Sequence, residues 1–416
     1  MTANHRRSDV APEQSPQVVI RNVAVFDGSG SPREAARAVV VEGRQIRWVG
    51  PEAELPEWAV GRVIDGRGGT LLPGLVNCHV HLCSDGAPDM FAQVAHDTIV
   101  WSALRGYLNI QATLEAGVTT VRDCGEADNV AIDLSHAVDE GLIDGPRIRA
   151  AGRVITMTGG HGHFIGREAD GPYDVRRATR AEIKEGAHFI KAMATGGVLT
   201  PGVTPTQTAL QPDELDAVAT EAHNAGRRTA CHAIGNAGIK NAIRAGIDSI
   251  EHGFYLDDEA LQLAVDRGTY LVPTLIAVNQ IVDNGRAGGI PDWVVVKAES
   301  ESGHHRESFA AAVRSGMKIA AGTDAGTPFN SHADMPLELS LMVDYGLRPV
   351  EALIAATRNA AENLDMLDKI GTVEVGKLAD LIVVEGDPTT SIKDITNVRV
   401  VLKDGVVYRD DYGARA

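Results

Sequence analysis

Six side chains of types that can bind a metal or move a proton lie in short apolar runs of this sequence. Two of them, His79 and His81, are separated by a single residue near the end of the run at 75–82. Side chains alternate along a strand, so this spacing places both imidazoles on one face. The other four lie in later runs and are Lys191, His232, His252 and Asp324. Imidazole and carboxylate together suit zinc or a similar divalent ion, so the set predicts a metal centre.

Each of these residues taken alone has an ordinary interpretation. A single strand histidine is more often a hydrogen-bonded core residue than a ligand, and a buried lysine more often pairs with a carboxylate. An unpaired polar group in an apolar strand costs roughly 1–3 kcal/mol. Several such groups buried together therefore need a shared partner, and a divalent metal is the simplest one.

The elements that must position these residues follow a regular repeat. Short apolar runs alternate with longer segments of helical period, which is the pattern of βαβ units and a parallel sheet. The runs are 75–82, 118–125, 146–156, 188–195, 228–233, 248–253, 269–275 and 318–326. The repeat predicts an α/β fold with a (β/α)8 TIM-like barrel, whose catalytic groups lie at the carboxyl ends of strands. An open doubly wound sheet is the alternative, disfavoured because no GxGxxG loop follows the first strand.

Short β-type runs, broken by Gly, Pro and Asp, lie on both sides of this repeat. The first group precedes Leu72 and the second begins at Gly371. We expect the two groups to form one small composite β-sandwich. The predicted domains are 1–72 and 366–416 for the two parts of the sandwich and 73–365 for the barrel. Residues 1–17 are polar and are predicted to be disordered.

Composition limits the classes of partner. The formal net charge of −17 disfavours nucleic acid and anionic membranes, because both require a basic face. The four cysteines contain no CxxC pair, which predicts reduced thiols rather than a disulfide framework or a zinc ribbon. Neither a signal-peptide core nor a run of about 20 apolar residues is present. We therefore expect a cytoplasmic protein that acts on a small molecule.

The order of the six residues resembles the amidohydrolase superfamily, and residues 371–387 are similar to its usual C-terminal run. The resemblance implies two divalent metal ions, with zinc as the expected element. It implies that His79, His81 and Asp324 hold the more buried ion and that His232 and His252 hold the second. Lys191, carboxylated by carbon dioxide to N6-carboxylysine, would bridge both, because a carbamate offers two anionic oxygens where an ammonium has only donors.

The resemblance also implies a hydrolytic mechanism. A metal-bridging hydroxide would attack the carbonyl carbon, and Asp324 would accept its proton and pass it to the leaving amine. Deaminases of the same superfamily typically use one metal and a glutamate shortly after the fifth-strand histidine. Here residues 232–236 contain no glutamate. Lys191 and the missing glutamate together favour a two-metal hydrolase.

Three segments, at 158–163, 188–200 and 252–257, resemble prolidase-like dipeptidases, carboxypeptidases and hydrolases of N-acyl amino acids such as ochratoxin A. The resemblance implies cleavage of an amide or peptide bond to a C-terminal amino acid. His161 would stabilise the oxyanion, Tyr255 would contact the substrate, and His163 is grouped with them as substrate-binding. The ordinary interpretations are solvated imidazoles in a glycine-rich loop for the two histidines, and packing for Tyr255.

Two further classes stay open. Carbamate, phenylurea and organophosphate hydrolases share much of this metal set, and a non-catalytic structural barrel of the same descent is the alternative outside enzymes. The resemblance also implies a homo-oligomer. Among the remaining histidines, His304 and His305 are predicted to form a solvated surface pair, and His332 is assigned no role.

Overall fold

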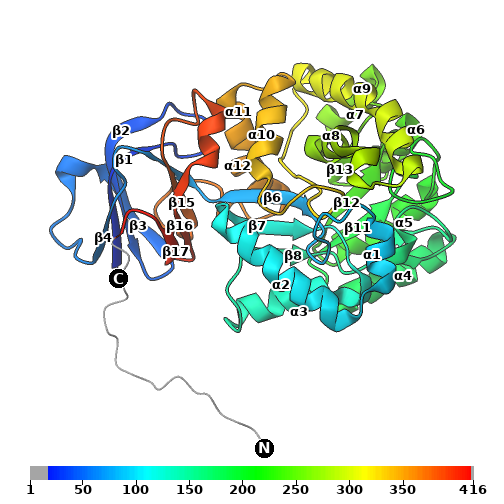
Figure 1. Ribbon diagram of the computed structural model, residues 1–416, viewed down its shortest axis with the longest axis horizontal. Coiled ribbons are helices and arrows are strands. Elements are labelled where there is room, and N and C mark those ends of the chain that lie inside the picture. Colours follow the sequence, from blue (N-terminus) through cyan, green and yellow to red (C-terminus); the bar gives the residue numbers. More distant parts are fainter. Residues whose placement is uncertain (1–16, 414–416) are drawn as a thin grey trace, which may run out of the picture.

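The computed structural model describes residues 17–413, which form a β-rich part and a larger part of alternating strands and helices (Figure 1). The disorder predicted for residues 1–17 lies outside the described residues, apart from Gln17, which is the first residue of strand β1. Both ends of the described chain belong to the β-rich part, and the larger part is built from the segment between them.

The β-rich part is one hydrogen-bonded sheet of eight strands that uses both ends of the chain. Its order is β17-β16-β15-β5-β1-β2-β3, and β4 pairs with β1. The strands are β1 (Gln17–Val25), β2 (Glu34–Glu42), β3 (Gln45–Pro51), β4 (Arg62–Asp65), β5 (Thr70–Pro73), β15 (Leu381–Val384), β16 (Val398–Lys403) and β17 (Val406–Asp410). Antiparallel pairing of β5 with β15 joins the two predicted groups of β runs. The arrangement as a sandwich stays a prediction.

The larger part confirms the predicted α/β fold with parallel strands. One parallel sheet has the order β6-β7-β8 and the other β10-β9-β11-β12-β13-β14. The strands are β6 (Leu75–Val80), β7 (Val118–Asp123), β8 (Arg147–Ala150), β9 (Val154–Thr156), β10 (Gly166–Glu168), β11 (Phe189–Met193), β12 (Arg228–Ala233), β13 (Ser249–His252) and β14 (Tyr270–Val272). The run predicted as one strand at 146–156 thus contains two, β8 and β9, with Gly152 at a positive φ of 73° between them.

The eighth predicted run, 318–326, is not a strand in the structure. It is held by isolated bridges, with Ile319 opposite Leu271 of β14 and Ala325 opposite Val80 of β6. The backbone nitrogens of Cys78 and His81 also donate to the carbonyls of Ala321 and Ala325 at 2.9 and 2.8 Å. The segment therefore lies between β14 and β6 without a continuous ladder.

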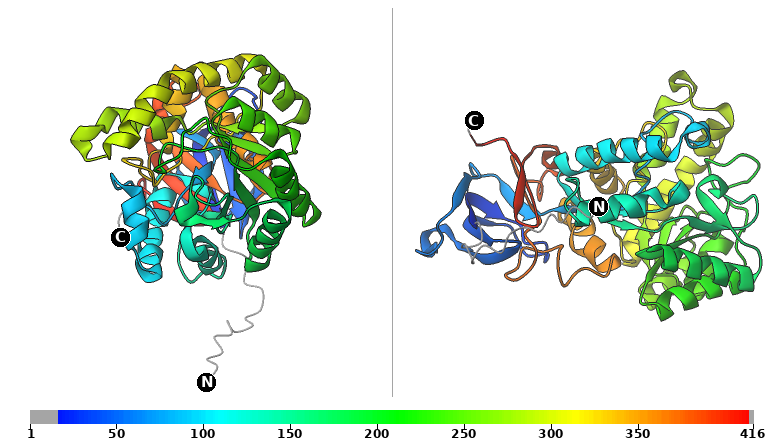
Figure 2. Two further views of the ribbon diagram at one scale, coloured as in Figure 1. Left: turned by 90° about the vertical axis from the view of Figure 1, so that its right-hand side faces the viewer. Right: turned by 90° about the horizontal axis from the view of Figure 1, so that it is seen from below.

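Helices lie outside the strands of the larger part, as the left view of Figure 2 shows. They are α1 (Met90–His96), α2 (Ile99–Glu115), α3 (Val130–Asp139), α4 (Pro172–Glu185), α5 (Pro212–Asn224), α6 (Asn236–Arg244), α7 (Asp258–Arg267), α8 (Leu275–Asn284), α9 (Asp292–Ser315), α10 (Met335–Asp344), α11 (Pro349–Ala355) and α12 (Arg358–Asn363). Local signals set their ends: the side chain of Asp257 caps α7 by accepting from Ala260, and Gly268 ends it in the left-handed conformation. Their apolar faces and the strands share one core.

A buried ion pair joins the sheet to the larger part. Arg147 of β8 donates to Asp380 at 2.6 Å and to Asp404 at 2.7 Å, and its side chain is 11% exposed. Asp380 precedes β15 and Asp404 lies in the turn between β16 and β17. Arg147 therefore compensates negative charge from both aspartates across the junction, and Arg44, 3.0 Å from Asp404, adds a second positive charge.

Two other sequence expectations concern cysteines and membrane spans. All four cysteines are free and buried, as predicted. Within residues 17–413, no helix combines the length and the apolar character needed to span a membrane.

Candidate metal centre

The carboxyl ends of the strands bring all six predicted ligands together. His79, His81, Lys191, His232, His252 and Asp324 line one cavity of about 690 Å³, a volume that includes space open to solvent. All six side chains are nearly buried. The residues come from β6, β11, β12, β13 and the segment at 318–326, so parallel strands do position them as the sequence predicted.

Three of these residues face one another through atoms that can each offer a lone pair to a cation. The Oδ1 atom of Asp324 lies 3.3 Å from Nε2 of His79 and 3.3 Å from Nε2 of His81. It is buried and accepts no hydrogen bond from any residue between 17 and 413. Three facing lone pairs repel one another in a buried site, so a cation among them is the natural partner.

The tautomers of His79 and His81 follow from the second nitrogen of each ring. Nδ1 of His81 lies 2.8 Å from the Gly125 carbonyl, which only accepts, so Nδ1 carries the proton. Nδ1 of His79 lies 2.7 Å from the buried Glu251 carboxylate and donates in the same way. In its neutral form each ring therefore presents the Nε2 lone pair towards Asp324, which is how imidazole binds a metal.

The histidines of the next two strands are oriented by the same rule. His232 Nε2 donates to the Gly196 carbonyl at 2.9 Å, which leaves Nδ1 as its acceptor nitrogen. Thr274 donates its hydroxyl proton to the Pro273 carbonyl, so it must accept from Nδ1 of His252 at 2.7 Å. His252 thus keeps Nε2 as the acceptor.

Lys191 lies on the same side of the cavity as His79. Its Nζ atom donates to Nε2 of His79 at 3.5 Å, which agrees with an unprotonated Nε2. His79, His252 and Asp324 each place one ligand atom within 4.8 Å of the others. The donor set is therefore imidazole, carboxylate and an amine that carbon dioxide would convert into a second anionic group.

The backbone at the site is strained. His252, Thr274 and Asp324 have φ values of 72°, 53° and 59°, in the left-handed region that side chains with a Cβ rarely adopt. Such conformations cost on the order of 1–3 kcal/mol each and cluster where geometry serves function. Two of the three are predicted ligands.

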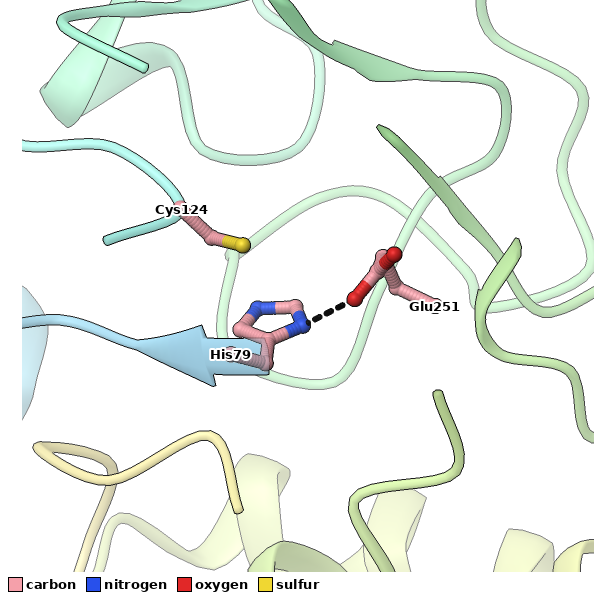
Figure 3. Close-up of side chains that lie close together, drawn as sticks. All are labelled: His79, Cys124 and Glu251. Atoms are coloured by element: carbon pink, nitrogen blue, oxygen red, sulfur yellow. Dashed lines mark hydrogen bonds and ion pairs between the residues drawn. The ribbon is translucent and has the colours of Figure 1, made fainter. Parts of the chain in front are cut away.

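A second buried group lies directly behind His79. Figure 3 shows the Glu251 carboxylate bonded to the imidazole, with Cys124 on the other side of the ring. Burial raises the pKa of the Cys124 thiol to about 12, so that group stays protonated. Glu251 is already engaged by His79, by Arg122 at 2.7 Å and by Ser249 at 2.7 Å. These groups orient His79 and do not form a second metal site.

Glu251 was missed by sequence reasoning, as was Arg122. Burial alone would raise the pKa of Glu251, but the charges of Arg122 and Lys191 lower it to about 2. Arg122 also donates to the Cys78 carbonyl at 2.6 Å, which ties β7 to β6. The available signal was a glutamate in a short strand directly before His252, because a buried carboxylate there needs charged or hydrogen-bonding partners.

Two buried carboxyl groups, those of Asp123 and Glu126, lie close enough to His81 to affect its charge. Asp123 accepts from the Leu82 nitrogen at 2.9 Å and Glu126 accepts from the Cys83 nitrogen at 2.8 Å, so together they hold the turn after β6. Burial raises the pKa of Glu126 to about 8, and the neighbouring Asp123 adds to this effect. Burial lowers the pKa of His81, but the neighbouring Asp324 carboxylate and the charges of Glu126 and Asp123 raise it to about 9. The position between His81 and Asp324 thus favours a positive charge, which either a proton or a metal ion can supply.

His161 also lines the cavity, as expected of an oxyanion-stabilising residue. Its ring centroid lies 4.3 Å from that of His232, and its Nδ1 is 2.8 Å from the Thr200 hydroxyl. Burial lowers the pKa of His161 to about 3, so the ring is neutral. A Cβ on Gly197 would come within 2.4 Å of this ring, which explains the glycine at that position. Lys297 of α9 holds the same loop by donating to the Thr200 carbonyl at 2.8 Å.

The other two predicted substrate-binding residues lie elsewhere. His163 stacks edge-on against Phe91 and Phe164, and Tyr255 packs against His304 with ring centroids 4.6 Å apart. Neither is among the residues that line the cavity. Tyr255 matches its ordinary interpretation as a packing residue, whereas His163 packs against aromatic rings instead of being a solvated imidazole. Contact of either residue with substrate stays a prediction.

The prediction that His304 and His305 form a solvated surface pair is wrong for His305. His304 is exposed, but His305 is 3% exposed, with its ring 4.0 Å from that of Phe254 and its Nε2 donating to the Pro273 carbonyl. The polar neighbours of His305 in the sequence concealed its position on the inner face of α9. His332, which was assigned no role, is also buried and donates to the Ser84 carbonyl at 2.9 Å.

The carboxyl ends of the parallel strands converge on imidazoles, a lysine and a carboxylate. An active site at this end of the strands is characteristic of a class of α/β enzymes. The amidohydrolase family matches residues 70–408, and the chain belongs to this family. The predicted superfamily is confirmed, and the protein is a hydrolase of that superfamily.

The similarity to these relatives covers almost the whole chain. The chain is 30% identical over 401 residues to the ochratoxinase of Aspergillus niger, covering 89% of this chain and 81% of the relative. A Xaa-Pro dipeptidase solved with methionine in its active site is 35% identical, with a TM-score of 0.88 over 94% of this chain and all of that one. A prolidase in complex with N-methylphosphonate-L-proline is 32% identical, with a TM-score of 0.88 over 95% of this chain and all of that one.

Proposed function

We propose that the protein is a metal-dependent amidohydrolase that cleaves the amide or peptide bond to a C-terminal amino acid, in a dipeptide or an N-acyl amino acid. The observation that carries the proposal is the meeting of Nε2 of His79 and Nε2 of His81 with Oδ1 of Asp324, 3.3 Å from each ring, where this buried oxygen accepts no hydrogen bond from any residue between 17 and 413. The ochratoxinase and dipeptidase relatives support the choice of an amide bond, and ochratoxin-like substrates belong to the proposed class.

The donor set suits two divalent cations, and zinc is the proposed element because imidazole and carboxylate ligands favour it. His79, His81 and Asp324 would hold one ion, and Nδ1 of His232 with Nε2 of His252 would hold the other. Lys191, as N6-carboxylysine, would supply an oxygen to each. Such ions lower the pKa of bound water from 15.7 towards about 7 and polarise the amide carbonyl.

The protein's own residues then perform the proton and charge steps. Asp324 is the carboxylate within the ligand cluster, and we assign it the transfer of the proton from the attacking water to the leaving amine. Burial would raise the pKa of Asp324, but the neighbouring His79, His81 and Lys191 hold it below its usual range, so the carboxylate stays ionised. His161, held neutral, offers Nε2–H to the oxyanion if Nδ1 accepts from Thr200.

The cavity walls favour a substrate with apolar groups on both sides of the scissile bond. One wall consists of Met90, Phe164, Ile165 and Met193, and the other of Val198, Ile234, Phe254, Val278 and Ile281. The ligand cluster lines the same cavity. Apolar side chains or an aromatic acyl group would be desolvated on binding, which supplies affinity without fixing one substrate.

The proposal includes a closed barrel of residues 73–365 with a composite sandwich from 1–72 and 366–416. Closure would run through the segment at 318–326, and the hydrogen bond from the Leu271 nitrogen to the Lys318 carbonyl, at 2.8 Å, supports it on the β14 side. The bonds from Cys78 and His81 to the same segment support it on the β6 side.

The test is a substrate screen on protein loaded with zinc in bicarbonate buffer. Dipeptides and N-acyl amino acids are compared with carbamates, phenylureas and phosphotriesters, and metal content is measured on the same samples. Release of a free amino acid that stops after chelation and returns with zinc supports the proposal. Activity confined to carbamates, ureas or phosphotriesters overturns the substrate class. A fully metal-loaded protein with no turnover on any class would instead indicate a non-catalytic barrel.

A further inference from the structure

Helix α2 presents an unusual face to solvent. Every exposed residue between Ile99 and Leu114 is apolar or aromatic. These residues are Ile99, Val100, Trp101, Leu104, Tyr107 and Leu108, with exposed fractions from 40% to 68%. The opposite face of the helix, which includes Gly106, Ile110 and Leu114, is buried against the core. The helix is therefore apolar on both faces.

Neighbouring helices show the ordinary pattern for a surface helix. The exposed residues of α3, which packs beside α2, are Asp133, His136 and Asp139. Four of the five exposed residues of α4 are charged, with Tyr173 as the exception. Of the sixteen large apolar side chains exposed on the described part of the chain, six lie on α2. The concentration on one helix is thus a local feature and not a property of the whole surface.

The one charge on this stretch of α2 is turned away from the exposed face. The side chain of Arg105 is 13% exposed and pairs with Asp85 and Asp97. No other charged residue occurs between Ile99 and Leu114, although the chain carries a net charge of −17. Two acidic copies repel one another over most of their surface, and this neutral face is where they can approach most closely.

The spacing and size of the face suit a second helix. Trp101, Leu104 and Leu108 follow the three-then-four spacing that forms the seam of paired helices. The six side chains together expose on the order of 700 Å², close to the roughly 800 Å² that each partner contributes to a standard interface. Trp and Tyr at the centre of such a face are the residue types that contribute most to binding.

A membrane surface is a poorer fit for this face. Helices that lie on anionic membranes carry Lys and Arg beside their apolar face, and α2 has only Arg105, which is already paired. We propose that the apolar face of α2 joins two copies of this chain across a two-fold axis, with their α2 helices antiparallel and Leu104 near the axis. α2 lies on the outside of the helical ring, where a second copy has access (Figures 1 and 2).

The test measures the molar mass of the full chain by light scattering and sedimentation at micromolar concentration. The wild-type mass is expected to be at least twice the chain mass of 44.1 kDa. The double substitution Leu104→Glu and Leu108→Glu should halve it, because four buried carboxylates would meet in the interface. The matched control is Leu142→Glu and Tyr173→Glu, at positions 78% and 84% exposed away from α2, which should leave the mass unchanged.

A crosslinking arm locates the axis independently of mass. The four native cysteines are buried, so Leu104→Cys introduces an exposed thiol that should form a disulfide with its counterpart in the second copy. A monomeric wild type, or a Leu104→Glu and Leu108→Glu variant that keeps the wild-type mass while remaining folded by circular dichroism, overturns the proposal. Binding of a monomeric wild type to phosphatidylglycerol vesicles, lost in that variant, overturns it in favour of a lipid surface.

Discussion

At the scale of single residues, the site is defined by the nitrogen and oxygen lone pairs that its side chains can offer to a cation. Each of the four histidines donates one ring proton to a carbonyl, a carboxylate or a hydroxyl, which leaves its other nitrogen as an acceptor. Asp324 adds an anionic oxygen to which no residue between 17 and 413 donates. Chemistry at this site therefore depends on tautomers that neighbouring groups impose, and substitutions of those neighbours test it.

Substitution of the central carboxylate, Asp324→Asn, should reduce turnover by at least about 10³-fold, because an amide cannot accept and return a proton. The fold should be retained, since Asn has the size of Asp. The measurements are the rate on the best substrate from the screen, metal content and circular dichroism. Hydrolysis at the wild-type rate by this variant would refute the role assigned to Asp324.

The orienting residue behind His79 gives a second test. In Glu251→Gln the carbonyl oxygen should turn towards Arg122, so the NH₂ group faces Nδ1 of His79 and forces the proton onto Nε2. Loss of that lone pair should weaken zinc binding by about 10–100-fold, the usual effect of removing a group that orients a ligand.

Competition with a chromogenic chelator measures the zinc affinity of Glu251→Gln. Ser249→Ala is the control, because Ser249 bonds the other carboxylate oxygen and leaves the His79 contact intact. Equal zinc affinity in Glu251→Gln and the wild type would show that His79 does not depend on this partner.

At the scale of elements, period and spacing predicted most strands correctly but not every face. The HxH spacing placed His79 and His81 on one side of β6, as alternation requires. Helix α9 was harder, because its polar sequence hid a buried face on which His305 stacks against Phe254. The segment at 318–326 has the sequence pattern of a strand but forms only isolated bridges, since Asp324 and Gly326 have positive φ values of 59° and 101°, outside the extended region.

The buried histidine of α9 should make stability depend on pH. Burial lowers the pKa of His305 to about 4, below the value of about 6.5 expected in the unfolded chain. Its contribution is therefore complete above pH 6.5 and is lost as the pH falls from there towards 4. The loss should be on the order of 2–3 kcal/mol, because the unfolded chain takes up the proton first.

Urea denaturation at pH 7.5 and pH 5 measures this effect. His305→Gln keeps an N–H donor for the Pro273 carbonyl but does not titrate, so it should lose less stability between the two pH values than the wild type. His304→Gln, at an exposed neighbouring position, should behave like the wild type. An identical pH dependence in all three proteins would contradict the burial argument.

At the scale of the whole molecule, the β-sheet and the parallel strands are joined by the ion pairs of Arg147. This guanidinium is largely buried between Asp380 and Asp404. A buried pair contributes little compared with apolar packing, but removal of one partner leaves the other charges without compensation.

Substitution Arg147→Met should therefore lower the free energy of unfolding by about 3–5 kcal/mol. Arg62→Met is the matched control: Arg62 pairs with Asp410 inside the sheet, is 54% exposed, and its loss should cost less than about 1 kcal/mol. Urea denaturation compares the two variants. A similar small loss in both would show that the junction does not depend on the Arg147 pairs.

The sequence by itself determined which residues take part and in what order. Residue type, a spacing of two in HxH and the repeat of apolar runs are local properties, and they indicated the six candidate ligands and the α/β class. Orientation depends on contacts between residues far apart in the chain, such as Glu251 with His79 and Thr200 with His161, which are separated by 172 and 39 positions. Those contacts form only when the strands align, so the tertiary structure alone decided the tautomers, the orienting layer and the apolar outer face of α2.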